Sequence, residues 1–530
     1  MDIIAGIEMA WKVGQVLIEY CQTWKAAEEE VSDRVIIVES AWFRISKQLE
    51  FLQEINLEDQ HRRILDDLVR VLVTRLSAAI TLINQTLKGE SEKRPALFKM
   101  MPRATKPRYL LLKSAIDDAI KEVEDWISRF DPSWYLVIRT ADMTIENKLV
   151  KARESEARRA SPSLKRHLRQ TQTPFQAAQG LREALRPDSA PHLFLKQIDL
   201  ERHKIVYSSA QTAREMNNPY APWLIIDSVV CHPGTDPNAM ARDVRALARK
   251  LTKADPLAFG LLSCKGIIKM PVDPVSGRQH ASLDLVLRMP KGFESGKSLR
   301  QFLLEQHDQN NFVSLSRHVA IAKDLARSVS SVHTFKFVHK NVRPESVLLL
   351  YSAEADAHAG FLVGFDNFRA ADGATNLRGD TEWDRNMYRH PSRQGEYPEE
   401  KYRMHHDIYS LGVCLLELGL HESFVSYDAV GVPQPGPLFG NFNEWLESSG
   451  HGGTWGASVF LKDYFIDMTL RKLPRFMGDK YAQIVLTCLT CLDDDSNDFG
   501  EEVDLSDRDG ITLGMKFIQK ILLQINELSV

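Results

Sequence analysis

Two cysteines are the side chains whose spacing comes nearest to a metal-ligand motif. Cys488 and Cys491 form a Cys-x-x-Cys pair. Thiolates at this spacing bind zinc when a second pair completes a four-ligand site, and no second pair lies nearby in the sequence. The pair also falls in the apolar run of residues 481–492, which is typical of a buried helix. We therefore expect two core thiols and no metal site.

An acidic run follows directly. Residues 493–509 carry nine acids and one base. The first positions imitate a calcium-binding loop, but such a loop needs glycine at its sixth position for a sharp turn. Asp498 stands there instead. We expect a solvated acidic loop, which also explains why the net charge is negative despite two basic stretches elsewhere.

Four stretches in the second half of the chain resemble, in order and spacing, the signature motifs of protein kinases. They are FKFVHKNVRPESVLLL (335–350), FLVGFDNFR (361–369), MYRHPSRQG (387–395) and HHDIYSLGVCLLEL (405–418). The first is similar to the catalytic loop, the second to the D-F-G segment and the third to the A-P-E segment. The fourth is similar to the helix whose aspartate holds the catalytic loop. The resemblance covers roughly residues 190–530 and implies a two-lobed α+β fold.

The residues that a kinase uses for phosphoryl transfer are replaced at the matching positions. Asn341 stands where the family has the carboxylate that accepts the substrate proton, and an amide cannot accept it. Arg343 matches the catalytic-loop lysine, and Ser346 matches the metal-binding asparagine. The D-F-G triplet reads Gly-Phe-Asp from Gly364 to Asp366, so the Mg²⁺ carboxylate is missing from its usual place. The resemblance thus implies no intact catalytic set.

The segment before these motifs lacks the phosphate-binding groups of the family. Residues 181–233 contain no glycine, so a glycine-rich phosphate loop is missing, and residues 205–249 contain no lysine. The position nearest the missing lysine is Asp227 or Ser228. The adjoining helix offers only Asp243 as an acid, which excludes the Lys–Glu ion pair. No cofactor is expected, and ATP binding remains open without support from any motif.

Three residues match family positions that hold the lobes and loops together. These are His339, Phe365 and Asp407, for which we expect a role in the core rather than in chemistry. The combination indicates a pseudokinase, which retains the fold for contacts and conformational change. An active atypical kinase is the alternative. It requires Asp366 or another carboxylate to recruit the metal, and some other base to replace Asn341.

The first 150 residues carry apolar side chains at helical spacing. Such stripes run over residues 3–21, 31–52, 68–83, 112–130 and 134–145. Asp131-Pro132 is expected to end one helix and begin the next. Because each helix must bury one face, the pattern predicts an antiparallel bundle over residues 1–150. In the first helix, Trp11 and Ile18 lie off the main stripe, and packing on another helix is favoured over insertion into a membrane.

The intervening residues predict the remaining domain organisation. Short β-like runs occur between residues 192 and 287, interrupted by one helix that opens at Asp236-Pro237. We expect a basic linker over residues 151–189, a kinase-like N-lobe over 190–290 and a C-lobe over 291–530. The predicted fold is therefore multidomain, with an all-α helical bundle followed by a two-lobed α+β kinase-like part.

The whole arrangement resembles fungal proteins with a HeLo or HeLo-like (HET-S/LopB type) domain joined to a protein-kinase-like domain. The resemblance is carried by MDIIAGIEMAWKVGQVL (1–17), by YRHPSRQG (388–395) and by GMKFIQKILLQIN (514–526). The layout is also similar to that of the mixed lineage kinase domain-like family of animals. These resemblances imply a bundle that attacks membranes in heterokaryon incompatibility or regulated cell death, under the control of the pseudokinase.

Two basic stretches bear on membrane binding. Residues 88–113 carry eight Lys/Arg against two acids, and residues 151–186 carry nine against three. Each cation near an anionic lipid surface contributes about 1 kcal/mol of attraction. The lipid-contact candidates, all expected in a loop, are Lys99, Arg103, Lys106 and Arg108. A plain solvated loop is the alternative.

Composition sets the remaining limits. The 530 residues include 67 Lys+Arg and 71 Asp+Glu, and the resulting net charge of −4 excludes nucleic-acid binding by bulk positive charge. The sequence contains no stretch of about 18 uncharged apolar residues, so we expect no membrane-spanning helix. The N-terminus lacks the basic region of a secretory signal, and six scattered cysteines are typical of reduced thiols. We expect a cytoplasmic protein, with peripheral membrane association left open.

The leading hypothesis is therefore a non-catalytic signalling protein. In it the kinase-like part senses a partner, and the bundle oligomerises or engages an anionic membrane. Expected partners are proteins or further copies of the chain, and no nucleic acid. An active atypical kinase and a scaffold that never touches membranes are the alternatives.

Overall fold

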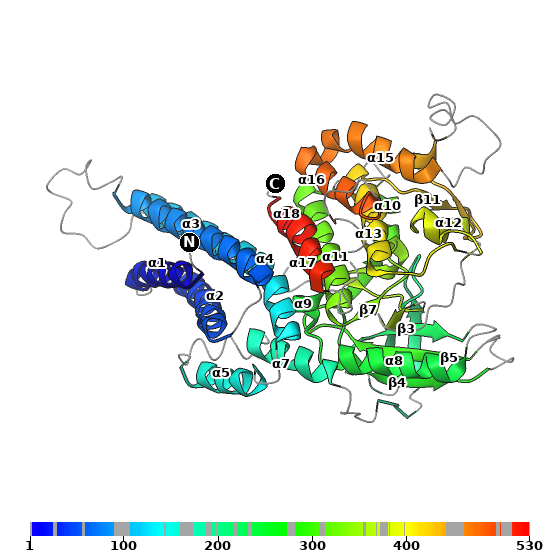
Figure 1. The fold of residues 1–530 in the computed structure, drawn as a ribbon, viewed down its shortest axis with the longest axis horizontal. Helices are drawn as coiled ribbons and strands as arrows, with labels where there is room; N and C mark the ends of the chain where they lie inside the picture. The colour runs from blue at the N-terminus through cyan, green and yellow to red at the C-terminus, as the bar shows by residue number, and fades with distance from the viewer. Residues whose placement is uncertain are drawn as a thin grey trace. The chain divides into compact units, whose positions relative to one another are not determined.

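A computed structural model describes most of the chain, which divides into two compact units, Met1–Arg182 and Glu183–Val530 (Figure 1). The described residues are 3–24, 29–55, 59–88, 106–141, 145–159, 173–186, 193–196, 199–216, 218, 220–231, 236–272, 281–306, 313–352, 357–366, 368–370, 380, 382–396, 398–440, 442, 460–493, 499 and 511–528.

The first unit is helical, as the apolar stripes predict. Its helices are α1 (Ile3–Trp24), α2 (Glu29–Gln53), α3 (Asp59–Lys88), α4 (Lys106–Thr140), α5 (Ile145–Arg159) and α7 (Pro174–Leu185). Helix α1 packs on α2 and α3, and α4 packs on the same two helices. The indole of Trp126 stacks on Phe130 with ring centroids 4.6 Å apart, and its Nε1 donates to the carbonyl of Leu68 at 2.8 Å. Aromatic packing therefore fills the middle of this unit.

The prediction that Asp131-Pro132 ends a helix is wrong. Helix α4 continues through Pro132 to Thr140. An interior proline removes one backbone hydrogen bond and costs about 3 kcal/mol. Phe130 and Trp134, on either side of the proline, are both fully buried and stack on each other. Asp131 pairs with Arg44 of α2 instead of capping a new helix. Burial of the aromatic face offsets the cost of the proline.

Part of the range predicted as a linker is helical. Helix α5 extends to Arg159, and α7 begins at Pro174. The ring of Phe175 in α7 packs edge-on against Phe51 and Trp134, so this helix belongs to the core of the first unit. The unit therefore extends beyond residue 150, because α7 carries an apolar face that the surrounding basic residues obscure in the sequence.

The side chains of the main stripe of helix α1 that the structure describes are buried, whereas its second apolar row (Ile4, Trp11 and Ile18) is only partly buried. Gly14 lies so close to Trp42 of α2 that a Cβ atom there would meet the ring at 2.2 Å. Ile18 is buried, as favoured from the sequence. Trp11 is 51% exposed, as is Ile4, so the expectation that Trp11 packs in the core is wrong.

The second unit begins with an antiparallel sheet of order β1-β2-β3-β5-β4. Its strands are β1 (Leu200–Lys204), β2 (Gln211–Glu215), β3 (Leu224–Val230), β4 (Cys264–Met270) and β5 (Ser282–Arg288). Helix α8 (Pro237–Thr252) lies between β3 and β4 in the chain and packs on β4 and β5. Asp236 caps this helix by accepting the amide of Asn238, which confirms the predicted start.

Of the predicted β-like runs, residues 192–195, 204–207 and 259–262 form no strand of their own within the described residues, although Phe194 and Leu261 each lie in an isolated β-bridge. Residues 205–208 form a turn after β1. Residues 256–259 form the short helix α9 (Pro256–Phe259), capped by Asp255, and Gly260 ends it at a φ of 63°. Caps at both ends outweigh the β preference of the apolar residues that follow.

The rest of the second unit is mainly helical, with short strands. Its helices are α10 (Leu299–Glu305), α11 (Leu315–Thr334), η2 (Pro344–Ser346), α12 (Trp383–Asn386), η3 (Pro391–Arg393), α13 (Met404–Leu420), η4 (Pro437–Phe439), α15 (Leu461–Arg471), α16 (Pro474–Leu489), α17 (Ile511–Phe517), η7 (Ile518–Leu522) and α18 (Leu523–Asn526). Its strands are β6 (Ser295–Ser298), β7 (Phe337–Val338), β8 (Val347–Ser352), β9 (Ala357–Leu362), β10 (Arg369–Ala370), β11 (Val425–Tyr427) and β12 (Pro433–Pro435). Helix α13 is buried along its whole length and packs on α11 and α16. Across the described ranges, no helix is both long and apolar enough to cross a bilayer.

Candidate functional site

The loop between β7 and β8 gathers the polar residues that the sequence singles out. It closes on η2, where the hydroxyl of Ser346 accepts the amide of Arg343 at 3.1 Å and donates to the carbonyl of the same residue at 2.8 Å. Ser346 is 1% exposed. Its side chain therefore stabilises its own turn and is not presented to a bound ion.

Asn341 uses both ends of its amide inside the protein. Its Nδ2 donates to the carbonyl of Gly364 at 3.0 Å and to Oδ1 of Asp366 at 2.7 Å. Its Oδ1 accepts from Nε of Arg343 at 2.8 Å. The side chain thus joins the loop before β8 to the turn after β9, and offers no group that can take a proton.

Arg343 is surrounded by carboxylates. Its guanidinium lies 3.8 Å from Glu345 and 4.0 Å from Asp384 of α12. Burial lowers the pKa of Arg343, but these carboxylates and Asp366 outweigh the burial, so the pKa is above its ordinary value. Arg343 therefore remains a cation and links the loop to α12.

Gly364 occupies a position that only glycine fits. Its φ is 81°, and a Cβ atom would lie 2.9 Å from Cβ of Ser346 and 3.1 Å from Nδ2 of Asn341. Asn341 and Ser346 belong to the stretch 335–350 and Gly364 to the stretch 361–369, and the structure brings the two stretches into contact. The absence of a side chain at Gly364 therefore allows the two loops to pack closely.

Asp227 is the buried group whose role the sequence did not predict. It lies on β3 with no exposed surface, and its Oδ2 accepts the amides of Gly364 at 2.9 Å and of Phe365 at 3.0 Å. Burial raises the pKa of Asp227 to about 6, against the effect of these two amides, and the charge of Asp366 adds to the rise. The lack of lysine over residues 205–249 drew attention to β3 in the sequence. It could not predict the contact of Asp227 with Gly364, because the two residues are 137 positions apart.

Asp407 of α13 holds the loop from the opposite side. It accepts the amides of His339 at 2.8 Å and Lys340 at 2.9 Å, the hydroxyl of Tyr402 at 2.7 Å, and Nε2 of His333 at 3.2 Å. Burial acts to raise the pKa of Asp407, but the hydrogen bond and charge of His333, with the other donors, bring it below its ordinary value.

His339 and Phe365 pack together beside this carboxylate. Their rings lie 4.7 Å apart, and neither side chain is more than 1% exposed. Burial lowers the pKa of His339, so the imidazole is neutral near pH 7. Its Nδ1 lies 3.3 Å from the amide nitrogen of Asn341. The geometry of both residues is that of a packed core.

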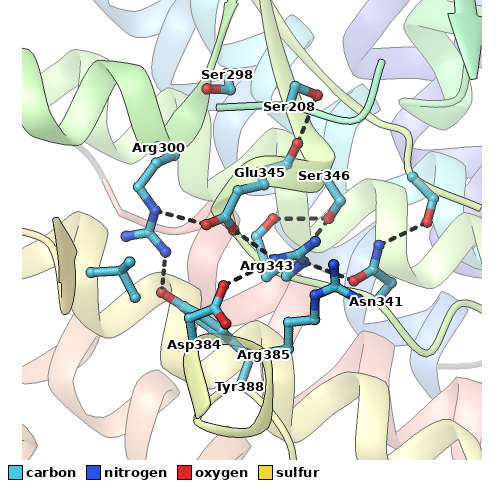
Figure 2. Close-up of polar contacts among 12 residues, drawn as sticks. Ser208, Ser298, Arg300, Asn341, Arg343, Glu345, Ser346, Asp384, Arg385 and Tyr388 are labelled. Carbon is cyan, nitrogen blue, oxygen red and sulfur yellow. Dashed lines mark hydrogen bonds and ion pairs between the residues drawn. The ribbon is translucent and has the colours of Figure 1, made fainter. Parts of the chain in front are cut away.

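A buried network of charged side chains lies next to the loop, and no sequence pattern predicted it (Figure 2). Arg300 of α10 has no exposed surface and donates to Glu345 at 3.0 Å and to Glu417 of α13 at 2.8 Å. Tyr388 donates to Glu417 at 2.8 Å. Burial would raise the pKa of Glu345, but Arg300 and Arg343 lower it to about 2. Isolated charged residues carry no periodic signal, so sequence patterns could not find this network.

The lipid-contact candidates fall only partly within the described residues. Lys99 and Arg103 lie outside them. Lys106 and Arg108 lie in the first turns of α4, where the backbone alone is described. Their expected position in a loop is wrong, because the helix begins earlier than its apolar stripe.

The thiols show no metal-binding arrangement. Cys488 and Cys491 are buried, as expected, and burial raises the pKa of both thiols. Cys264 and Cys414 are also buried and free, whereas Cys231 is half-buried. Within the described part of the chain, no three His, Cys, Asp or Glu side chains are grouped to hold a metal ion. The acidic run after Asp493 lies almost wholly outside the described residues.

No family model matches the chain, and no curated protein matches its sequence. The site is therefore interpreted from its own geometry.

Proposed function

We propose that the second unit is a protein-kinase-like domain that does not transfer phosphate and acts as a signalling element for the helical unit. The sheet order, with α8 between β3 and β4, supports the kinase-like fold. So does the buried Asp407, which holds the backbone of the loop that carries Asn341. The match of four sequence motifs supports the same fold.

The observation that carries the loss of catalysis is the bonding of Asn341. At the position of the catalytic base, an amide donates two hydrogen bonds and accepts one, all from groups of the same protein. Phosphoryl transfer depends on positioned groups of the right charge, and a carboxamide cannot take the proton of a substrate hydroxyl. Binding of a substrate would therefore not restore catalysis, because the site would still lack a group that accepts the proton.

The charge of the site also disfavours nucleotide. Asp227 brings a carboxylate to the strand where the family has a phosphate-pairing lysine, and Asp366 adds a second carboxylate nearby. Like charges at short range in a buried site repel strongly. We propose that the domain works without ATP.

Nucleotide binding and transfer can be tested directly on the full chain. Saturating ATP with Mg²⁺ should leave the melting temperature unchanged, whereas a ligand at 100 times its Kd would add about 2.7 kcal/mol of stability. No radioactive phosphate should be incorporated. Mg²⁺-dependent incorporation that survives Asn341→Ala but disappears in Asp366→Ala would instead support the atypical kinase.

For the helical unit we propose binding to anionic membranes or self-association, as in HeLo-type cell-death proteins. Trp11 and Ile4 support this because both are half exposed on one helix. An amphipathic helix with an exposed tryptophan can lie in a membrane interface, and a basic stretch adds long-range attraction that salt weakens.

The vesicle test compares the fragment 1–186, which retains α7, with the full chain. The fragment should bind anionic vesicles at low salt, bind neutral ones weakly, and exceed the full chain. Trp11→Ser should reduce binding, whereas Val150→Ser, at a residue 43% exposed on α5, should not. Binding to anionic vesicles should be abolished when four cations are replaced together by glutamate, namely Lys99, Arg103, Lys106 and Arg108.

Circular dichroism shows whether these variants remain helical. A folded fragment that ignores anionic vesicles at low salt contradicts the membrane role. The scaffold that never touches membranes then replaces it.

A further inference from the structure

The loop between β1 and β2, residues 205–210, is folded toward the helical part of the second unit. We call this loop the lid. It is a tight turn in which the amide of Ser208 donates to the carbonyl of Ile205 at 3.1 Å. The hydroxyl of Ser208 accepts the amide of Ala210 at 3.2 Å. The lid therefore has a defined shape of its own.

Three contacts fasten the lid to residues far along the chain. The hydroxyl of Ser298 donates to the carbonyl of Val206 at 2.7 Å. The hydroxyl of Ser208 donates to the carbonyl of Glu345 at 2.8 Å. The ring of Tyr207 stacks on Tyr427 with centroids 4.3 Å apart and planes 15° apart. A hairpin loop free in solvent would make none of these contacts.

Glu345 is the centre of the surface on which the lid lies. Its carbonyl accepts from Ser208, while its carboxylate accepts from Tyr427 at 2.9 Å and from Arg300 at 3.0 Å. Figure 2 shows Ser208 bonded to the backbone of Glu345, with the carboxylate of Glu345 turned toward Arg300. The buried network thus fixes Tyr427 in position for the ring of Tyr207.

Backbone strain marks the same contact. Tyr207 has a φ of 51°, in the left-handed region that disfavours a bulky residue. Such a conformation persists only when the surroundings hold it. The stacked ring of Tyr427 and the hydrogen bonds on both sides of Tyr207 supply that constraint. Loss of these contacts would favour a different backbone.

Asp227 provides a second fastening between the same two parts. It reaches from β3 to the amides of Gly364 and Phe365, beside Asn341. The sheet is therefore tied to the helical part at the lid and at Asp227.

We propose that the lid is a closed intramolecular latch, held by the bond from Ser208 to Glu345, and that its release is the conformational change of this unit. A sensor needs two states, and the lid supplies a closed state without a ligand. This inference deepens the proposed signalling function and rests on it for the biological role. The latch itself depends only on contacts within the second unit.

Hydrogen exchange on the full chain tests the latch. Ser208→Glu removes the donor and brings a negative charge to the carbonyl and carboxylate of Glu345. The exchange of peptides that cover residues 205–210 and 343–346 should rise at least about fivefold, because one neutral hydrogen bond contributes about that factor. Ser209→Glu adds the same charge at the exposed neighbouring residue and should leave both peptides unchanged.

Ser208→Ala provides a second variant with no added charge, in case the glutamate unfolds the unit. Faster exchange in the lid with an unchanged melting temperature supports the latch. Exchange equal to that of the wild type in both Ser208 variants overturns it. This readout uses neither nucleotide nor vesicles, so its failure is separate from a failure of the proposed function.

Discussion

Replacement of Asp407 by alanine is the sharpest test of the core around the loop. The carboxylate has no exposed surface and accepts four hydrogen bonds. Two of the donors are the backbone amides of His339 and Lys340, and the others are Tyr402 and His333. Alanine would leave all four donors without this acceptor in a buried site.

The expected loss follows from these contacts. An unsatisfied buried donor costs about 1–3 kcal/mol, and more where the hydrogen bond involves a charged group. Because rotation and water can relieve some of the four donors, we expect a loss of about 4 kcal/mol for the second unit. Because the entropy of unfolding grows with the number of residues, a loss of that size lowers the melting temperature of the unit Glu183–Val530 by about 5 °C.

Differential scanning calorimetry of the full chain measures this change, which should be confined to the unit that contains Asp407. Asp428→Ala is the matched control. Its carboxylate also accepts two backbone amides, from Val430 at 2.9 Å and Val432 at 2.8 Å, but in an exposed turn. The control should melt close to the wild type.

The pH dependence has a definite sign. Because the pKa of Asp407 lies below 3.8 in the folded protein, its contribution is complete above that pH and is lost as the pH falls through the lowered pKa. The difference between wild type and Asp407→Ala should therefore shrink in acid. Equal melting temperatures at neutral pH would refute the reasoning and show that the carboxylate is not buried among these donors.

Two further changes have predictable results. Gly14→Ala should destabilise the helical unit by about 2 kcal/mol, because its Cβ would overlap the buried Trp42. Gln15→Ala, on the exposed face of the same helix, should not, and calorimetry of the two variants measures the difference. Asp227→Asn should remove a pH-dependent loss of stability. In the wild type the raised pKa makes unfolding easier as the pH rises from 3.8 to about 6, by about 3 kcal/mol. Urea unfolding of both proteins at pH 3.8 and at about pH 6 measures this difference in the free energy of unfolding. An equal change between the two pH values in the wild type and in Asp227→Asn would contradict the prediction.

The sequence alone determined the helical character of the first unit and the chemical nature of the loop residues. Apolar spacing and helix-start residues are local properties, so the first predicted the buried stripe of α1 and the second predicted the start of α8 at Asp236. The identity of Asn341 excluded a catalytic base before any geometry was known. Both inferences need only residues that are close in the chain.

Only the tertiary structure decided which distant groups meet. The helix continues through Pro132 because stacked aromatic rings outweigh a local helix-breaking preference. Asp227 meets Gly364 across 137 residues, and Arg300 meets Glu417 across 117. Charged side chains enter a core only as partners of other buried groups, and that partnership leaves no periodic trace in a sequence. The lid, the ionic network and the carboxylate on β3 therefore became visible only when the chain was folded.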